Sequence, residues 1–444
     1  MGFQQGLSGL NAASKSLDVI GNNIANASTV GFKQGQTQFA DVYANSLNGS
    51  SGGTVGIGTK VSGVVQQFTQ GNISTTNNPL DIAINGGGFF RMSTNGAITY
   101  TRNGQFQLDK LGNIVNAQGA QLTGYVANSA GVLSTGAAAP ININTADIPP
   151  AQTTTINAVM NLDSRKLVPG TQLPATIPPV ITPIAFSATD PTTYNSSTSV
   201  AVFDSLGNSH VVQSFFVKRD NTAPAPTPPV TIEWDVFATV DGVLINGAGA
   251  TTNSITRLGF DNLGKLSAVT PPFSATDPRA TTLTVPVSTG AVTPINTTLN
   301  IKYDFTGTTQ FGSDFSVSKN TQDGYASGKL AKFNTAKDGT IVGSYTNGKT
   351  SVLAQVVLAN FTNPNGLQST GDNQWIETAA SGNSLVGPPN SGSLGTLTSS
   401  ATEDSNTDLT GELVNMITAQ RVYQANAQTI KTQDQVLQTL VNLR

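Results

Sequence analysis

The chain has 444 residues, more than a single hydrophobic core usually accommodates, so more than one domain is expected. Charged residues make up only 11% of it and the net charge is −3, which gives no electrostatic argument for nucleic-acid binding. Cysteine is absent, which excludes disulfides, thiolate metal sites and thiol nucleophiles, and His210 is the only histidine available for a catalytic relay or a zinc site. No apolar run approaches about 18 residues, so membrane insertion is not expected.

Residues 1–33 predict an amphipathic helix at the N-terminus. Apolar residues recur at helical spacing, and Gly31 after Val30 is a suitable stop. The residues expected on the apolar face are Leu7, Leu10, Leu17, Ile20 and Ile24. The segment does not resemble a secretory signal peptide, because its first charge is Lys15 and it has no continuous apolar core. If the protein leaves the cytoplasm, we expect a route without a cleaved leader.

Residues 405–444 predict a second, longer helix, with Ser405 and Asp408 at capping-box spacing. The expected apolar stripe is Leu413, Met416, Tyr423, Ala427, Ile430, Leu437 and Val441. Its spacing alternates between three and four once the polar residues Gln420 and Asp434 are accepted within it. A long helix with one thin apolar stripe needs a partner. We expect the two terminal helices to pair with each other and with copies from other subunits; the alternative is that each packs on its own globular domain.

The chain between the helices predicts nested all-β domains. Residues 71–147 and 316–382 read as an inner β-domain, and the Pro- and Thr-rich residues 148–315 read as an inserted outer β-domain. Residues 34–70 and 383–404, rich in Gly and Ser, read as connectors or extended arms. The predicted fold class is therefore α+β, mainly β, with paired, coiled-coil-like terminal α-helices and all-β domains inserted between them.

The most specific signal follows the first helix and resembles the signature of the bacterial flagellar rod and hook proteins, the axial family. The matching positions are Asn22, Asn23, Ala25, Asn26, Thr29, Gly31, Phe32 and Lys33. Residues 83–90 and 100–106 resemble a second family segment, of the form Ala-Ile-x-Gly-x-Gly-Phe-Phe followed by Tyr-Thr-Arg-x-Gly-x-Phe. Residues 353–367 resemble the segment that closes the inner β-domain in that family. In physical terms, the asparagines are suited to ending the helix and Gly31 to reversing the chain.

The resemblance implies a structural subunit rather than an enzyme, and the large inserted domain favours a hook subunit over the distal rod protein. Such subunits stack helically into a hollow, bendable tube lined by the terminal helices and transmit torque from rod to filament. The implied partners are further copies of the chain, the distal rod, the hook cap, the hook–filament junction proteins and the flagellar type III export apparatus. The implied location is the extracellular hook. Gln420 and Asp434 would either fix the helix register or face the lumen.

Other function classes are weaker. A secreted β-rich adhesin fits the Thr-rich centre but does not explain the terminal helices. A glycosidase would need paired carboxylates, and no convergent pair can be identified. The glycines at 56–58 fit no phosphate-binding motif, so no cofactor is expected. The Asp-x-Leu-Gly segments at Asp109, Asp204 and Asp261 lack the carboxylates of a calcium loop and predict turns.

The resemblance also suggests how the tube bends. A rotating, bent joint changes the spacing between neighbouring subunits in every turn, so outer-domain contacts should be small and polar. The uncharged surface of residues 148–315 suits contacts that depend little on salt. The glycine-bearing connectors, 34–70 and 381–400, are the expected hinges.

Overall fold

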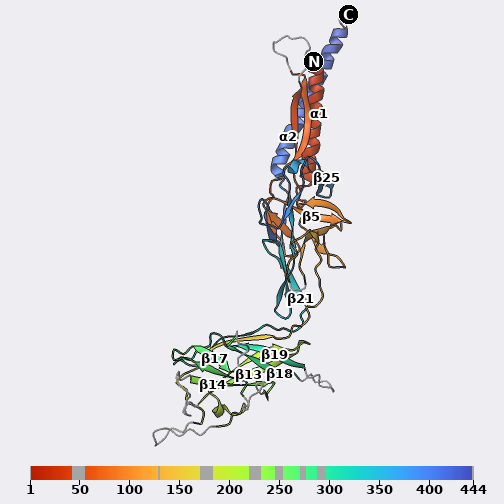
Figure 1. Ribbon diagram of the computed structural model, residues 1–444. Coiled ribbons are helices and arrows are strands. Elements are labelled where there is room, and N and C mark those ends of the chain that lie inside the picture. Colours follow the sequence, from red (N-terminus) through yellow and green to blue (C-terminus); the bar gives the residue numbers. More distant parts are fainter. Residues whose placement is uncertain are drawn as a thin grey trace. The chain divides into compact units, whose positions relative to one another are not determined.

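The computed structural model describes residues 2–42, 56–128, 131–170, 184–219, 232–245, 254–270, 277–287 and 297–442. These residues form two compact units, which are described separately (Figure 1). Unit 1 comprises Met1–Ala146, Leu330–Tyr345 and Lys349–Arg444, and unit 2 comprises Asp147–Lys329 and Thr346–Gly348. The structure is mainly β with a helix at each end of the chain, which confirms the predicted fold class.

The two terminal helices, α1 (Gly2–Ala25) and α2 (Leu409–Asn442), pack side by side in unit 1 (Figure 1). Glycines on α1 permit the close approach, since a Cβ at Gly9 would lie 2.7 Å from Asn426 Oδ1 and one at Gly6 would lie 3.0 Å from Ile430 Cγ1. The order of these contacts makes the pair antiparallel. Within the described part of the chain, no helix is long and apolar enough to cross a membrane.

Both helices are shorter than the sequence predicts at the ends that face the β-domain. α1 ends at Ala25, and turns cover the residues up to Gly31. α2 begins at Leu409 rather than Ser405, and its cap is Asp408, whose Oδ1 accepts a hydrogen bond from the Thr410 amide at 3.0 Å. The residues before it have other partners, because β29 (Ala401–Glu403) pairs with β3 (Ile73–Thr75) and the Asn406 side chain bonds to Gln34, Gln67 and Thr69.

A hairpin of β1 (Gly35–Val42) and β2 (Gly58–Gln66) packs along α1. Gln5 Nε2 donates to the Gly56 carbonyl at 2.6 Å, and the Ser8 hydroxyl accepts from the Thr59 amide at 3.3 Å. These strands come from the stretch 34–70 that the sequence predicts as a connector. Its central residues, 43–55, lie outside the described residues.

Most of the β-structure of unit 1 belongs to one sheet with the main order β21-β22-β23-β9-β5-β6-β26-β25. Its buried side chains form the principal core of the unit. The strands of unit 1 beyond the hairpin are β3 (Ile73–Thr75), β4 (Ile82–Asn85), β5 (Phe89–Thr94), β6 (Ala97–Thr101), β7 (Gln107–Leu108), β8 (Ile114–Val115), β9 (Gln121–Val126), β10 (Ala139–Pro140), β21 (Leu330–Thr335), β22 (Thr340–Tyr345), β23 (Thr350–Val356), β24 (Leu358–Asn360), β25 (Gln368–Gly371), β26 (Gln374–Ile376), β27 (Leu385–Gly387), β28 (Thr396–Ser399) and β29 (Ala401–Glu403).

The C-terminal return, residues 383–404, differs from the connector that its composition suggests. β27 pairs with β24, β28 with β4, and β29 with β3. Leu397 and Ala401 are buried in these pairings. This stretch is therefore part of the β-domain, and its strand pairing argues against the hinge expected at 381–400.

Unit 2 is built from a four-stranded sheet, β18-β19-β11-β20, and a six-stranded sheet with main order β12-β13-β14-β16-β17. Side chains from both sheets form one core. The strands are β11 (Thr155–Asn161), β12 (Ser196–Phe203), β13 (Ser209–Lys218), β14 (Ile232–Val240), β15 (Val243–Ile245), β16 (Thr256–Phe260), β17 (Leu266–Thr270), β18 (Ala280–Val287), β19 (Thr297–Asp304) and β20 (Ser316–Gln322). The predicted Pro-rich breaks at 178–179 and 223–229 lie outside the described residues.

The limits of unit 2 differ from the predicted outer domain at its C-terminal side. β20 follows residue 315 but pairs with β11, so it completes the smaller sheet of unit 2. The chain enters and leaves the unit at adjacent points, because Ile148 and Gly328 form an antiparallel bridge. Asp204 and Asp261 of this unit act as turn residues: the Oδ1 of Asp204, for example, accepts from the Leu206 and Asn208 amides at 2.9 and 2.8 Å.

We predict that one buried tyrosine makes unit 2 sensitive to alkaline pH. Burial raises the pKa of Tyr303 to about 12, and its hydroxyl lies 3.0 Å from that of Ser214. An unfolded tyrosine loses its proton near pH 10, so the free energy of unfolding should fall as the pH rises from 10 to 12, by up to about 3 kcal/mol.

The measurement is a pH series of denaturant unfolding for Tyr303→Phe against the wild type, followed by the fluorescence of Trp234, the only tryptophan of unit 2. Near pH 8 the variant should be less stable by about 1 kcal/mol, because the Ser214 hydroxyl loses its partner. Above pH 10 the free energy of unfolding of the wild type should fall by roughly 1.4 kcal/mol per pH unit, so the difference between the two proteins should vanish near pH 11. A difference that stays constant across the series would contradict the prediction.

Candidate functional site

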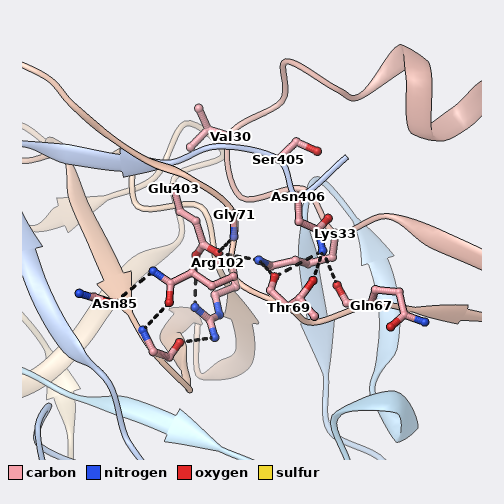
Figure 2. Close-up of polar contacts among 12 residues, drawn as sticks. Val30, Lys33, Gln67, Thr69, Gly71, Asn85, Arg102, Glu403, Ser405 and Asn406 are labelled. Atoms are coloured by element: carbon pink, nitrogen blue, oxygen red, sulfur yellow. Dashed lines mark hydrogen bonds and ion pairs between the residues drawn. The ribbon is translucent and has the colours of Figure 1, made fainter. Parts of the chain in front are cut away.

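Three segments that are distant in sequence meet below the end of α1 at a buried ion-pair network (Figure 2). Lys33 follows α1, Arg102 follows β6, and Glu403 ends β29. Lys33 Nζ lies 2.6 Å from Glu403 Oε1, and Arg102 Nη1 lies 3.2 Å from Glu403 Oε2. The side chains of Lys33 and Glu403 are fully buried and that of Arg102 is almost so. One carboxylate therefore joins the N-terminal segment, the β-domain and the approach to α2.

Backbone groups complete the network. Lys33 Nζ also donates to the Thr69 carbonyl at 2.7 Å, and Arg102 Nη2 donates to the Gly86 carbonyl at 2.9 Å. Glu403 Oε1 accepts a further hydrogen bond from the Gly71 amide at 3.0 Å. The two cations outnumber the carboxylate, so these carbonyl dipoles are needed to stabilise the excess positive charge away from water.

Burial changes the pKa of both cations. It lowers the pKa of Lys33, and the adjacent Glu403 carboxylate opposes that lowering. Burial likewise lowers the pKa of Arg102, again against the effect of Glu403. Both shifts mean that the charged forms depend on Glu403. At this site, therefore, the carboxylate of one segment stabilises the positive charges of two others, and they stabilise its negative charge.

Asn406 holds the segment after Glu403 against the base of the β1–β2 hairpin. Its Nδ2 donates to the Gln67 carbonyl at 2.7 Å and to Thr69 Oγ1 at 2.9 Å, and its Oδ1 accepts from the Gln34 amide at 2.8 Å. Figure 2 shows this side chain beside Lys33, Thr69 and Gln67. One amide therefore fastens the start of β1 and the end of β2 to the chain that leads into α2.

The family-motif asparagines shape the exit from α1. The buried Asn23 side chain binds both backbone groups of Gly35, with its Nδ2 2.8 Å from the carbonyl and its Oδ1 2.9 Å from the amide. Asn26 Nδ2 donates to the Asn22 carbonyl at 3.0 Å, and Asn26 Oδ1 accepts from the Thr29 hydroxyl. The Asn23 bonds hold the start of β1 against α1, and the Asn26 bonds brace the turns that follow the helix.

Gly31 allows the chain to pass close to the β-domain. Its φ is +72°, and a Cβ there would lie 2.6 Å from the Asn103 amide nitrogen. Its own amide donates to the Glu403 carbonyl at 2.8 Å. Phe32, the next motif residue, is buried, whereas Ala25 is exposed on the last turn of α1. The motif thus combines a left-handed turn, an apolar anchor and a cation in three successive residues.

The residues of the two predicted apolar stripes are buried to different extents in the structure. In α1, Ile20 is buried, Leu10, Leu17 and Ile24 are half-buried, and Leu7 is exposed. In α2, Met416, Ala427 and Ile430 are half-buried, whereas Leu413, Tyr423, Leu437 and Val441 are exposed. Gln420 and Asp434 are also exposed, and Asp434 accepts a hydrogen bond from Gln438 Nε2 at 3.1 Å. The single chain therefore covers only part of the α2 stripe.

Glu403 and Asn406 were missed by the sequence analysis, and Arg102 was noted only as part of a family segment. A signal exists only for Arg102, a charged residue at the end of the strand-like stretch 97–101; Glu403 and Asn406 lie in a polar stretch that offers none. Pairing them required the chain path, because Glu403 lies 370 residues from Lys33 and 301 from Arg102.

We predict that Glu403→Gln destabilises unit 1 by about 3–5 kcal/mol, because both buried cations lose their counter-ion. Unfolding should be followed by Trp375 fluorescence in a Trp234→Phe background, since Trp375 is then the only tryptophan. Glu377→Gln is the matched control: it makes the same substitution in the same unit, but Glu377 is exposed. The control should change stability by less than about 1 kcal/mol, and equal effects of the two variants would contradict a structural role for the network.

We also predict that Gly31→Ala destabilises unit 1 by more than the left-handed conformation alone explains. Gly119 supplies the comparison, because its φ is +80° and a Cβ there would have no atom within 4 Å. Gly119→Ala should cost about 1–2 kcal/mol from backbone strain. Gly31→Ala should cost clearly more in the same assay, since its Cβ would also clash with backbone; equal losses would show that the close approach is not a constraint.

Models of flagellar protein families match four separate parts of the chain. Four family profiles match in order: flagella basal body rod protein at residues 3–33, flagellar hook protein FlgE/F/G D1 domain at 83–159, flagellar basal body protein FlaE D2 domain at 161–325, and flagellar basal body rod FlgEFG protein C-terminal at 398–443. The first and last of them cover most of α1 and α2.

Similar proteins that match over their full length are flagellar hook proteins. The chain is 44% identical to flagellar hook protein FlgE of Salmonella typhimurium and 42% identical to that of Escherichia coli, with 100% of both chains covered in each case. A crystal structure of Helicobacter pylori flagellar hook protein FlgE2 matches with a TM-score of 0.52 at 14% identity, covering 73% of this chain and 98% of the other, and supports the fold. The distal rod and adhesin alternatives are not favoured. The chain therefore belongs to the flagellar hook protein family and is a structural subunit of the hook.

Proposed function

We propose that this hook subunit polymerises through its terminal helices into a hollow, bendable tube, with α1 and α2 forming the inner wall. The observation that supports this most strongly is the exposed apolar surface of α2. In the single chain, Leu413, Val414, Ile417, Val422, Val436, Leu437 and Val441 are all exposed. Apolar side chains gathered on one helix in this way are typical of a surface that becomes buried in an assembly.

Among the described residues, the C-terminal end of α2 has no helical partner. Ile430 lies opposite Gly6, and α1 begins only about one turn before Gly6. The part of α2 after Asp434 therefore extends beyond α1, and it includes Leu437, which is 54% exposed, and Val441, which is 74% exposed. We infer that helices of neighbouring subunits cover this end in the polymer.

The same proposal assigns a role in the tube to each part of the subunit. The helices and the hairpin form the polymerising core, and the β-domain of unit 1 connects them to the inserted unit 2. Unit 2 supplies polar outer contacts that yield as the tube bends. Transmission of torque from rod to filament is the mechanical role that this arrangement supports.

The remaining partners are proposed from family resemblance. They are the distal rod at one end of the hook, the hook cap during growth, the hook–filament junction proteins at the other end, and the flagellar type III export apparatus. Export through that apparatus would deliver the subunit to the extracellular hook.

We predict that the paired substitution Leu437→Gln and Val441→Gln prevents polymerisation but leaves the folded subunit intact, because both side chains are exposed in the single chain. The measurements are sedimentation and electron microscopy of polymer, with circular dichroism melting of the unpolymerised subunit. Leu437→Met with Val441→Ile is the control, which keeps the surface apolar and should polymerise. Normal polymerisation of the Gln variant would overturn the proposal that α2 forms the wall.

A further inference from the structure

A groove of about 640 Å³ runs along the packed helices of unit 1. Its walls come from α1, the β1–β2 hairpin and the first half of α2. Much of the lining is apolar, with Ala12, Ile20 and Phe39 among the contributing residues, and amides such as Asn23 and Asn415 add polar groups. Glu412 is the one charged residue among the described residues that line the groove. The groove is thus largely neutral, with a single carboxylate.

Glu412 has no partner for that charge within the described part of the chain. The residue is only 7% exposed, and its Oε2 is buried without a hydrogen bond or an ion pair. Its position one turn into α2 lets the helix dipole offset some of the cost. A dipole does not replace a hydrogen bond, however, and a buried charge is normally paired. The geometry points to a cation that enters the groove from outside the single chain.

The opposite side of α2 carries the complementary features. Arg421 follows Glu412 by nine residues, which at about 100° per residue places it on the far side of the helix. Val414 and Ile417 lie on that side as well and are 58% and 51% exposed. Arg421 itself is exposed and forms no ion pair with any described residue. This side thus carries a short apolar stripe, Val414 and Ile417, next to the cation Arg421 and followed by polar residues such as Gln428.

We propose that α2 of a second copy of the chain lies in this groove and that its Arg421 pairs with Glu412 of the first copy. This inference rests on the proposed function, since it names the partner surface and the ion pair through which the helices polymerise. The groove and the stripe are different surfaces, so their contact is heterologous and propagates into a helical polymer instead of closing a dimer. A planar, weakly hydrated guanidinium is better suited than an ammonium to a buried contact with a carboxylate.

The first test compares Glu412→Gln, Arg421→Gln and the double variant in a polymerisation assay at fixed ionic strength. Each single variant should raise the subunit concentration needed for polymer by about tenfold or more, because it leaves the other charge buried alone. The double variant should be no worse than the poorer single variant, because the two residues act as a pair. Glu412→Gln should not lower the melting temperature of the unpolymerised subunit, because that subunit gives Glu412 no partner. Additive effects, or a less stable subunit that polymerises normally, would overturn the pairing.

A charge exchange gives the second test. Arg421→Glu should block polymerisation, and adding Glu412→Arg in the same chain should restore it, since every interface would then contain the reversed pair. Lys431→Gln is the control on α2 and should have little effect; a loss equal to that of Arg421→Gln would overturn the assignment to Arg421. The Leu437→Gln and Val441→Gln variant separates the two proposals: if it polymerises normally, the proposed function fails, whereas if only Glu412→Gln polymerises normally, this inference alone fails.

Discussion

The ion pairs of Glu403 are the contact on which the arrangement of unit 1 depends. One carboxylate binds a lysine that follows the first helix and an arginine from the β-domain, and its backbone carbonyl accepts from Gly31. The segments are hundreds of residues apart, so bringing them together has a high cost in chain entropy. Burial makes the contact hard to replace, because a cation left in that place without the carboxylate would be an unpaired buried charge. The network thereby fixes where the helical part of the subunit meets its β-domain.

Around this network, polar residues of the family motif, together with Asn406, act mainly on the backbone. Asn23 and Asn406 each bind backbone groups of a neighbouring segment, and Gly31 removes the side chain that would prevent close approach. Such contacts pair buried amides and carbonyls that would otherwise be costly. They also explain why the motif is rich in asparagine and glycine, residues with low helix propensity that suit chain reversals.

The terminal helices differ from this network, because much of their apolar surface remains exposed in the single chain. α1 approaches α2 through glycine and alanine, which allow close packing but bury little area per residue. The larger side chains of α2, such as Ile417 and Leu437, remain exposed. Glu412 is incompletely satisfied as well, because its Oε2 is buried without a partner among the described residues. A subunit of a polymer gains from such a distribution, because its free form stays folded while assembly still releases substantial free energy.

The sequence by itself determined the features that depend on neighbouring residues: the two helices from their periodicity and the Asp-x-Leu-Gly turns. The Asp338-Gly339 and Asn347-Gly348 pairs are local signals of the same kind, since both stand in hairpin turns of the structure, with φ values of +81° and +78° at the glycines. Only the tertiary structure decided that Glu403 partners Lys33 and Arg102, that residues 383–404 pair as strands, and which side of α2 faces α1. The physical reason is range: propensity, capping and turn geometry act over a few residues, whereas ion pairing and strand pairing depend on the path of the whole chain.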